Sequence, residues 1–248
     1  MTNTAIKYLP FVVLLIAWEA AVRAGLLNPA FFSSPVAVAM AAIDWYGTGK
    51  IVPNLARTLE EILAGVGLTF LIGVPLGILL GWYQWFAATA SPVLLFLNAV
   101  PAVAVGPVVP LVLGIGPWTA IALVFFLTVL PLAINVAAGV RTASADLLRM
   151  GRHFGAGDRQ LLTTIVMPSV VPYLIGATRG NIGRALAGAL VGEWMGSNGG
   201  LGWMMFNAAG IFEVKSVYVG AVTVVGISLL ASALLGVTEA RLYRWRPA

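Results

Sequence analysis

The segment DLLRMGRHFGAGDRQLLTTIVMPSVVP, residues 146–172, decides how the rest of the chain is interpreted. It is polar and lies between two long apolar blocks. Four of the arginines and the only histidine fall in this segment or just before it: Arg141, Arg149, Arg152, Arg159 and His153. A basic segment between apolar blocks is typical of a loop held outside a membrane. We therefore expect residues 141–172 to form a loop that a partner binds.

The composition predicts a membrane protein. Of the 248 residues, 60% are hydrophobic and 9% are charged, whereas soluble domains carry roughly 25% charged residues. The apolar residues form runs of about twenty, the length that a helix needs to cross the hydrocarbon layer. Because the runs are continuous rather than alternating, they favour helices over a closed barrel. We expect an all-α membrane protein with one transmembrane domain over residues 1–248.

The charge balance and the rare residue types exclude several other classes. The net charge of +5 does not indicate nucleic-acid binding, because the basic residues lie at the ends of the apolar runs, where membrane topology explains them. The absence of cysteine excludes disulfides and thiolate metal sites, and a single histidine argues against a histidine-based one. We expect the chain to bind membrane lipid, and no nucleic acid or metal.

Six transmembrane helices are predicted, over about residues 8–26, 60–81, 92–113, 118–140, 173–195 and 218–240. Lys and Arg residues set the orientation of such helices. With both termini in the cytoplasm, that side carries eight basic residues (Lys7, four in the loop and three in the tail), and the other side carries three. The first run also has features of a signal peptide, but its length and Glu19 with Arg23 favour a helix in the bundle.

Two segments on the predicted outer side contain further apolar sequence. Residues 36–45 are expected to form a short surface helix, and the glycine-rich segment 196–217 a re-entrant or surface-lying piece. The third span contains Pro101 and Pro107, and broken helices at membrane depth are tolerated where they face protein or a water-filled cavity. These prolines are therefore pathway candidates, with ordinary helix kinking as the alternative.

Within the loop, residues 144–160 are predicted to form a short helix followed by a turn. Asp146 lies near the helix start, where a carboxylate complements the helix dipole. Gly155 and Gly157 allow a tight bend, and Pro168 marks the return to the membrane. This pattern favours a docking element for another protein; the alternative is an amphipathic helix lying on anionic lipid.

The spacing of the loop resembles that of the "EAA" loop of ABC-importer permeases. Gly155 is followed by nine residues and then by Ile165-Val166-Met167-Pro168, which matches the glycine and the I-x-L-P end of that pattern with Met in place of Leu. Arg149, Met150 and Gly151 stand where the pattern has E-A-A. Similarity to the nitrate/sulfonate/taurine permease group extends over about residues 28–246, through Ser34-Pro35-Val36, Gly73-Val74-Pro75-Leu76-Gly77, Gly114-Ile115-Gly116, Glu193, Gly200-Leu201-Gly202 and Arg241-Leu242-Tyr243-Arg244-Trp245.

The resemblance implies a type I ABC importer (MetI-like) permease fold in a bacterial inner membrane. Two identical copies would form the pathway, two separate ATPase subunits would bind ATP and Mg, and a periplasmic or lipid-anchored binding protein would deliver substrate. It further implies that the chain itself is not an enzyme and binds no cofactor; no lysine completes G-x-x-x-x-G-K-[ST]. The substrate would be a small anion or organic solute such as nitrate, a sulfonate or taurine. The implied ATPase-coupling residues are Arg149, Gly151, Arg152, Phe154, Gly155, Ala156, Asp158, Arg159 and Pro168.

Ionisable residues inside predicted spans are candidates for the substrate pathway or its gate. Arg179 and Glu193 lie about 40° apart around one helix and are expected on one cavity-facing stripe, although Arg179 also fits an interfacial anchor and Glu193 an interhelical hydrogen bond. Arg184 lies off that stripe, where a deep cation would attract an anionic substrate.

Two other classes of function stay open at this point. A secondary transporter would need no ATPase, but such folds often contain inverted repeats, and none is visible. An intramembrane enzyme would need a catalytic motif, and neither G-x-S-x-G nor H-E-x-x-H occurs.

Overall fold

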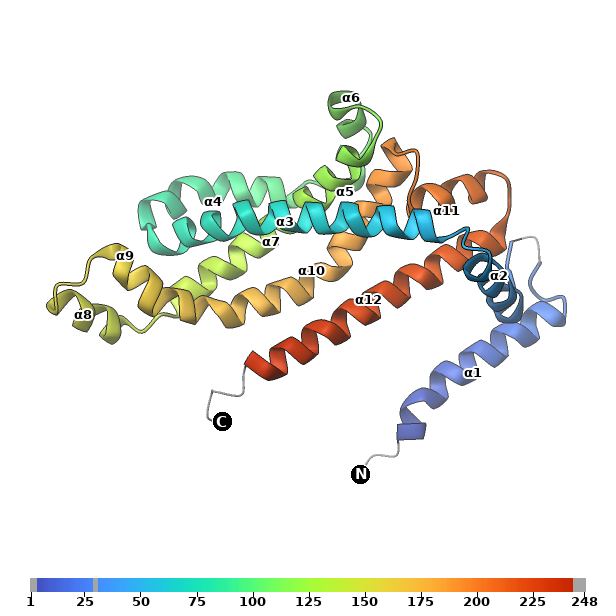
Figure 1. The fold of residues 1–248 in the computed structure, drawn as a ribbon, viewed down its shortest axis with the longest axis horizontal. Coiled ribbons are helices and arrows are strands. Elements are labelled where there is room, and N and C mark those ends of the chain that lie inside the picture. Colours follow the sequence, from blue (N-terminus) through green and yellow to red (C-terminus); the bar gives the residue numbers. More distant parts are fainter. Residues whose placement is uncertain (1–3, 29–30, 243–248) are drawn as a thin grey trace.

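A computed structural model describes residues 4–28 and 31–242, and within these ranges the chain is helical with no strand (Figure 1). The helices follow in the order α1 Thr4–Arg23, α2 Pro35–Gly47, α3 Val52–Trp82, α4 Gln84–Ala99, α5 Ala102–Val105, α6 Val109–Leu113, α7 Pro117–Arg141, α8 Ala145–His153, α9 Asp158–Leu161, α10 Met167–Gly196, α11 Leu201–Gly210 and α12 Val214–Leu242. A π-helical turn, Leu162–Val166, joins α9 to α10. The predicted all-α membrane fold is confirmed.

Helix α7 is the centre of the molecule and packs between α3 and α10. In its most apolar stretch 61% of the residues are buried, compared with 22% or less in the other long apolar helices. The helices α3 and α7 run in the same direction, so their ends coincide. Figure 1 shows α8 and α9 at one end of the long helices, called here the loop end, and α2 and α11 at the opposite end, called here the α11 end.

Small residues at every fourth position let α3 approach α7 closely. A methyl group on Gly77 would lie 2.5 Å from Cβ of Val136 and 2.6 Å from the carbonyl oxygen of Ala133. Contacts of the same kind repeat about every turn along α3, and one step of the repeat is a threonine pair. The pairs are Gly65 with Val124, Thr69 with Thr128, Gly73 with Leu132, Gly77 with Val136 and Gly81 with Val140. Rows of side chains spaced by four residues interdigitate in this way. In a membrane the hydrophobic effect does not drive helices together, so their association depends on the close van der Waals packing that small residues permit.

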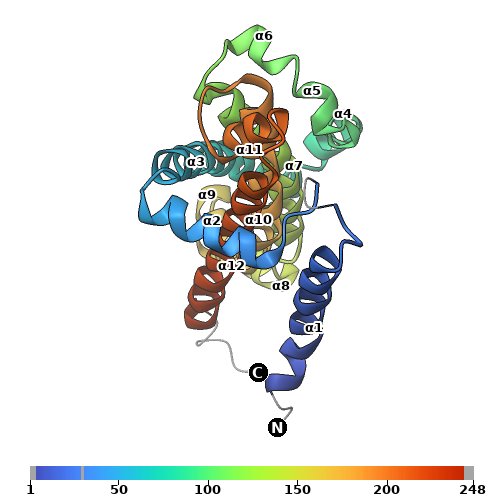
Figure 2. The same ribbon diagram turned by 90° about the vertical axis from the view of Figure 1, so that its right-hand side faces the viewer.

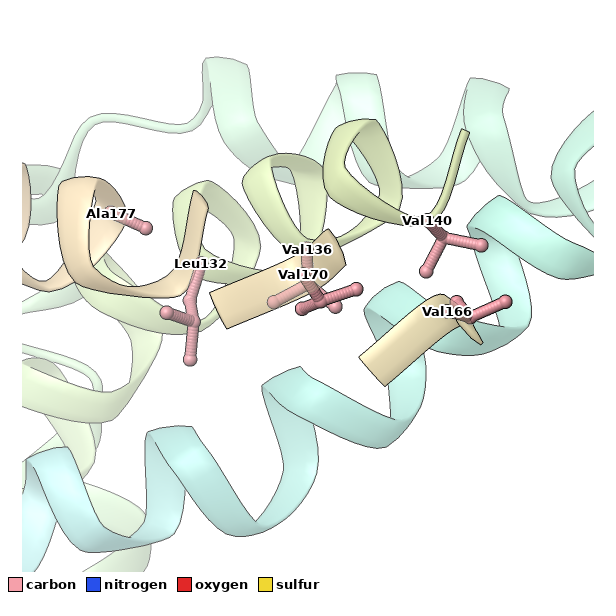
Figure 3. Packing of buried hydrophobic residues seen from close by; sticks show 6 residues of the cluster. All are labelled: Leu132, Val136, Val140, Val166, Val170 and Ala177. Atoms are coloured by element: carbon pink, nitrogen blue, oxygen red, sulfur yellow. The ribbon is translucent and has the colours of Figure 1, made fainter. Parts of the chain in front are cut away.

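The other face of α7 packs against α10, which runs in the opposite direction. Gly188 and Gly192 lie directly over the backbone of Val124 and Ala120, respectively. Toward the loop end the contact becomes an aliphatic cluster of Leu132, Val136, Val140, Val166, Val170 and Ala177 (Figure 3). The cluster includes Val166 of the π-helical turn, so the predicted loop packs directly against the core between α7 and α10.

Four helical segments are long and apolar enough to cross a membrane among the described residues: Val52–Trp82, Pro117–Arg141, Asp158–Gly196 and Val214–Glu239. They contain the spans predicted at 60–81, 118–140 and 173–195, and nearly all of that at 218–240. Helix α1 covers most of the 8–26 span and diverges from the helical body toward its N-terminal end (Figures 1 and 2). It contacts α2, and the ring of Trp18 lies 5.4 Å from that of Tyr218 in α12. The count of six crossings stays a prediction.

The predicted span over residues 92–113 is not one continuous helix, because this region is divided into α4, α5 and α6. Pro101 has no amide hydrogen, and a proline disfavours helical geometry in the residue before it. Val100 accordingly has extended dihedrals, with φ −72° and ψ 119°. A second interruption contains Pro107, and Gly114 then ends α6 with φ +80°. The prolines therefore break this helix rather than kink it.

The 36–45 and 196–217 segments form α2 and α11, which pack together with α12. Their shared core contains Val38, Ile51, Leu201, Met204 and Val219. Both short helices lie at the α11 end (Figure 1), and Tyr46 contacts Thr223 of α12 at 2.9 Å between the hydroxyl oxygens. The α11 end is thus capped by packed helices rather than by extended loops.

Candidate functional site

Helix α8 is well specified by its own sequence. Ser144 precedes it, and its hydroxyl oxygen accepts the Leu147 amide at 3.4 Å, as expected of an N-cap residue. The helix ends at His153, and Gly155, two residues further on, has φ +79°. The Gly155 amide donates to the carbonyl oxygen of Arg152, and the Ala156 amide to that of Gly151. This pair of bonds is the glycine-dependent C-terminal motif of many helices, so the predicted glycine bend is present.

The bend folds α9 back against α8. A methyl group on Gly151 would lie 2.5 Å from Cδ2 of Leu161, which is only 1% exposed. The third position of the E-A-A pattern therefore holds a glycine because the two arms touch there. The two arms form a preorganised helical hairpin, not a flexible loop.

The second half of the predicted 141–172 loop continues directly into the membrane helix. Residues 158–196 form one helical rod, and the Met167 amide donates to the carbonyl oxygen of Leu162. This wider turn accommodates Pro168, which has no amide hydrogen to offer. Pro168 therefore lies in the first turn of α10, and Pro172 lies inside the same helix.

Helix α8 presents two different faces. At about 100° per residue, Leu147, Met150 and Phe154 lie on one side, and they are 52%, 53% and 86% exposed. Arg149 and Arg152 lie on the opposite side, near the ends of α3 and α7. Arg149 forms an exposed ion pair with Asp146. Exposed large apolar side chains grouped on one helix face are typical of a protein-binding surface.

Two of the remaining coupling candidates lie on α9. Asp158 begins this short helix, where its carboxylate complements the dipole. Arg159 is exposed, and its carbonyl oxygen accepts the Thr163 hydroxyl at 3.0 Å. The structure thus brings the nine coupling candidates together at the loop end. One face of α8 is exposed, and the opposite face lies near the ends of α3 and α7.

Glu193 lies in a sealed hydrogen-bond network at the α11 end. It is 0% exposed, its Oε1 accepts the Thr58 hydroxyl at 2.6 Å, and its Oε2 accepts the Gly202 amide. Thr58 in turn accepts the Leu201 amide at 2.9 Å, and Asn54 accepts the Gly200 amide at 3.0 Å. The network joins α3, α10 and the first turn of α11, whose N-terminal amides would otherwise lack acceptors.

The glycines of Gly200-Leu201-Gly202 fit around the Glu193 carboxylate. Gly200 has φ +102°, and a Cβ there would collide with the carboxyl group of Glu193. A Cβ on Gly202 would lie 2.9 Å from Oε2 of the same side chain. The motif and the glutamate are therefore parts of one structure, which sequence spacing alone does not reveal.

Glu61 is a buried acid that the sequence interpretation missed. It is 1% exposed, its Oε1 accepts from Nε of Arg57 at 3.2 Å, and its Oε2 is buried without a partner among the described residues. It neighbours Glu193. The sequence does contain a signal for Glu61, because a carboxylate inside the predicted 60–81 span is costly to bury and is therefore a candidate functional residue.

The other pathway candidates are spread over the structure. Arg179 pairs with Glu239 of α12 at 3.1 Å, and Glu193 is fully buried. The two residues therefore do not form the shared cavity-facing stripe that the helical spacing predicted. Arg184 is exposed on α10, and its guanidinium donates to the carbonyl oxygen of Gly180 and to Oδ1 of Asn181. Pro101 and Pro107 are exposed at the two breaks between α4 and α6. The structure does not bring these five residues together in one protomer.

Comparison with known proteins gives one consistent family. Residues 73–244 match the family described as binding-protein-dependent transport system inner membrane component. The riboflavin transport system permease protein RibX of Chloroflexus aurantiacus is 31% identical, over 94% of this chain and 87% of its own length. The formylaminopyrimidine transport permease protein ThiX of Halalkalibacterium halodurans is 27% identical, over 95% and 94%. The taurine transport system permease protein TauC of Escherichia coli is 24% identical, over 94% and 86%.

A solved structure supports the fold. A chain of the inward-facing MetNI methionine ABC transporter superposes with a TM-score of 0.64 at 21% identity, and the match covers 78% of this chain and 94% of that one. The family match spans more than half of the sequence and contains the α8–α9 hairpin, α7 and Glu193. The chain therefore belongs to the binding-protein-dependent transport system inner membrane components, and it is a multi-pass membrane permease component of an ABC importer.

Proposed function

We propose that two copies of this chain form the substrate pathway and that each docks a separate ATPase subunit through the α8–α9 hairpin. The observation that carries the proposal is the exposed face of Leu147, Met150 and Phe154. These side chains project from a short helix whose bend and second arm are fixed by packing, so the face is preorganised for binding. ATP and Mg would be bound by the partner, and the permease would have no catalytic site of its own.

The second copy is proposed to face the open side of α10. Gly176, Gly180 and Gly183 have no atoms near the space that a Cβ would fill, and Arg184 lies beside them on the same helix. Small residues permit close helix approach in membranes. A homodimer joined along this side would place two copies of Arg184 near the pathway, where an anionic substrate would meet them.

Both termini are proposed to lie in the cytoplasm with the coupling hairpin. The first turn of α1 and the last turn of α12 point to the same side of the molecule (Figures 1 and 2). The excess of Lys and Arg on the loop side gives the same orientation. The α11 end would then face the periplasm of the bacterial inner membrane and receive the periplasmic or lipid-anchored binding protein.

The transported substrate is proposed to be a small anion or organic solute such as nitrate, a sulfonate or taurine. The relatives are named for chemically different compounds, which include riboflavin, formylaminopyrimidine and taurine. In this arrangement the separate binding protein supplies most of the selectivity. Identifying the ligand that this binding protein carries would settle the substrate class.

Reconstitution into proteoliposomes tests ATP dependence. Permease with its ATPase and binding protein should accumulate substrate when ATP is present and no ion gradient is imposed. Permease alone should accumulate nothing under a proton or sodium gradient. Gradient-driven uptake without ATP would contradict the proposal and favour a secondary transporter.

A further inference from the structure

A polar cavity of about 420 Å³ lies between α8 and the loop-end tips of α3 and α7. Its lining contains three arginines, Arg141, Arg149 and Arg152, together with Trp82 and otherwise small or aliphatic residues. None of these lining residues is acidic. The cavity is therefore suited to an anion.

The three arginines are available to a ligand to different extents. One guanidinium nitrogen of Arg141 donates to the carbonyl oxygen of Leu80 at 3.2 Å, which fixes the side chain and leaves its other donors. Among the described residues Arg149 is paired only with Asp146, and both side chains are largely exposed. Such exposed pairs are weak. Arg152 makes no hydrogen bond or ion pair with the described residues through its side chain. Arginine forms bidentate hydrogen bonds with phosphate oxygens.

The position of the cavity indicates where the anion comes from. Trp82 is the last residue of α3 and Arg141 the last of α7, and both helices are long and apolar enough to cross a membrane. The cavity thus opens where these helices leave the hydrocarbon layer. Tryptophan is enriched at that depth, and basic pockets between transmembrane helices bind anionic headgroups.

We propose that Arg141, Arg149 and Arg152 bind the phosphate of an anionic phospholipid headgroup and that this lipid fixes α8 to the membrane surface. The lipid would occupy the face of α8 opposite to Leu147, Met150 and Phe154, so both faces can be bound at once. A bound lipid would transmit a push on α8 to the tips of α3 and α7 through the headgroup.

Native mass spectrometry of the full-length permease tests the site directly. The purified chain is mixed with phosphatidylglycerol or phosphatidylcholine at equal concentrations, and bound lipid is counted. Arg149→Gln/Arg152→Gln should bind phosphatidylglycerol about thirtyfold more weakly, because each arginine near an anionic headgroup contributes roughly a fivefold gain. Arg152→Gln alone should give about a fivefold loss, so the test does not depend on the double variant folding.

Arg159→Gln is the matched control, because Arg159 belongs to the same hairpin but does not line the cavity. This variant should bind phosphatidylglycerol as the unmodified chain does. Equal binding of the two lipids, or an equal loss in Arg159→Gln, would overturn the proposal in favour of general surface attraction. Full competition by inorganic phosphate at matched concentration would show a free-anion site instead. Unchanged lipid binding with lost ATPase attachment in Arg152→Gln would assign these arginines to the protein partner.

Discussion

Replacing Glu193 with alanine should release the first turn of α11 from α3 and α10. The substitution leaves the buried Gly202 amide without its acceptor, which costs about 1–3 kcal/mol. The Thr58 hydroxyl keeps an acceptor, because the carbonyl oxygen of Asn54 lies 3.1 Å away. Lost side-chain packing adds roughly 1 kcal/mol. The sum, about 3 kcal/mol, corresponds to an increase on the order of a hundredfold in the equilibrium for local opening of α11.

The chain contains no cysteine, so one introduced thiol can report the opening. Ala208 lies on α11 and is 5% exposed, and an Ala208→Cys thiol should react with a maleimide only when the helix detaches. In the purified permease the labelling rate should follow the open fraction. Glu193→Ala should raise this rate by about the factor given above.

Two control substitutions separate hydrogen bonding from charge. Glu193→Gln keeps an acceptor for Gly202 and an amide group that can donate to Thr58, so its labelling rate should stay within a few fold of the parent. Glu60→Ala removes an exposed carboxylate one residue from Glu61 and should change nothing. An unchanged rate in Glu193→Ala, or an equal increase in Glu60→Ala, would refute the assignment of Glu193 as the residue that holds α11.

Three further predictions follow from the glycines and from Arg184. Gly155→Val places a branched side chain on a left-handed backbone, which costs about 1–3 kcal/mol of conformational free energy, and it should lower uptake while ATP hydrolysis continues. Gly157→Val, at φ −75°, should transport normally. Equal uptake in the two variants would show that the bend is dispensable. Gly77→Ala should lower the melting temperature, because overpacking costs about 1–3 kcal/mol of stability. Gly67→Ala has no atoms near its added methyl group and should leave the melting temperature unlowered. Equal melting temperatures in the two variants would contradict the close α3–α7 contact. Arg184→Gln should reduce uptake of an anionic substrate with little change in ATP hydrolysis, and unchanged transport would remove Arg184 from the pathway.

Much of the fold could be predicted because local patterns determine it. The long apolar runs gave α7, α10 and α12, and Ser144 with Gly155 gave the bounds of α8. Prolines were the main source of error, since their effect depends on the neighbouring geometry. Pro101 breaks its helix, whereas Pro168 follows a π-helical turn that absorbs the missing hydrogen bond.

Long-range contacts limited the prediction of the sites. Thr58 and Glu193 are separated by 135 positions, and no periodicity in either helix reveals that they meet. Glu239 was not linked to Arg179 for the same reason, because the ion pair joins different helices. The two faces of α8 were accessible in principle from helical spacing, but their different surroundings required the positions of α3 and α7.

Attachment of the ATPase to the exposed face of α8 is tested most directly by a charge placed on that face. Phe154→Asp places a charge on this face, and because the side chain is 86% exposed, folding of the permease should be preserved. Phe206→Asp is the matched control, since Phe206 is 57% exposed on α11 at the opposite end. Phe154→Asp should lose co-purification of the ATPase, whereas Phe206→Asp should retain it. Full co-purification with Phe154→Asp would contradict the docking of the ATPase on this face.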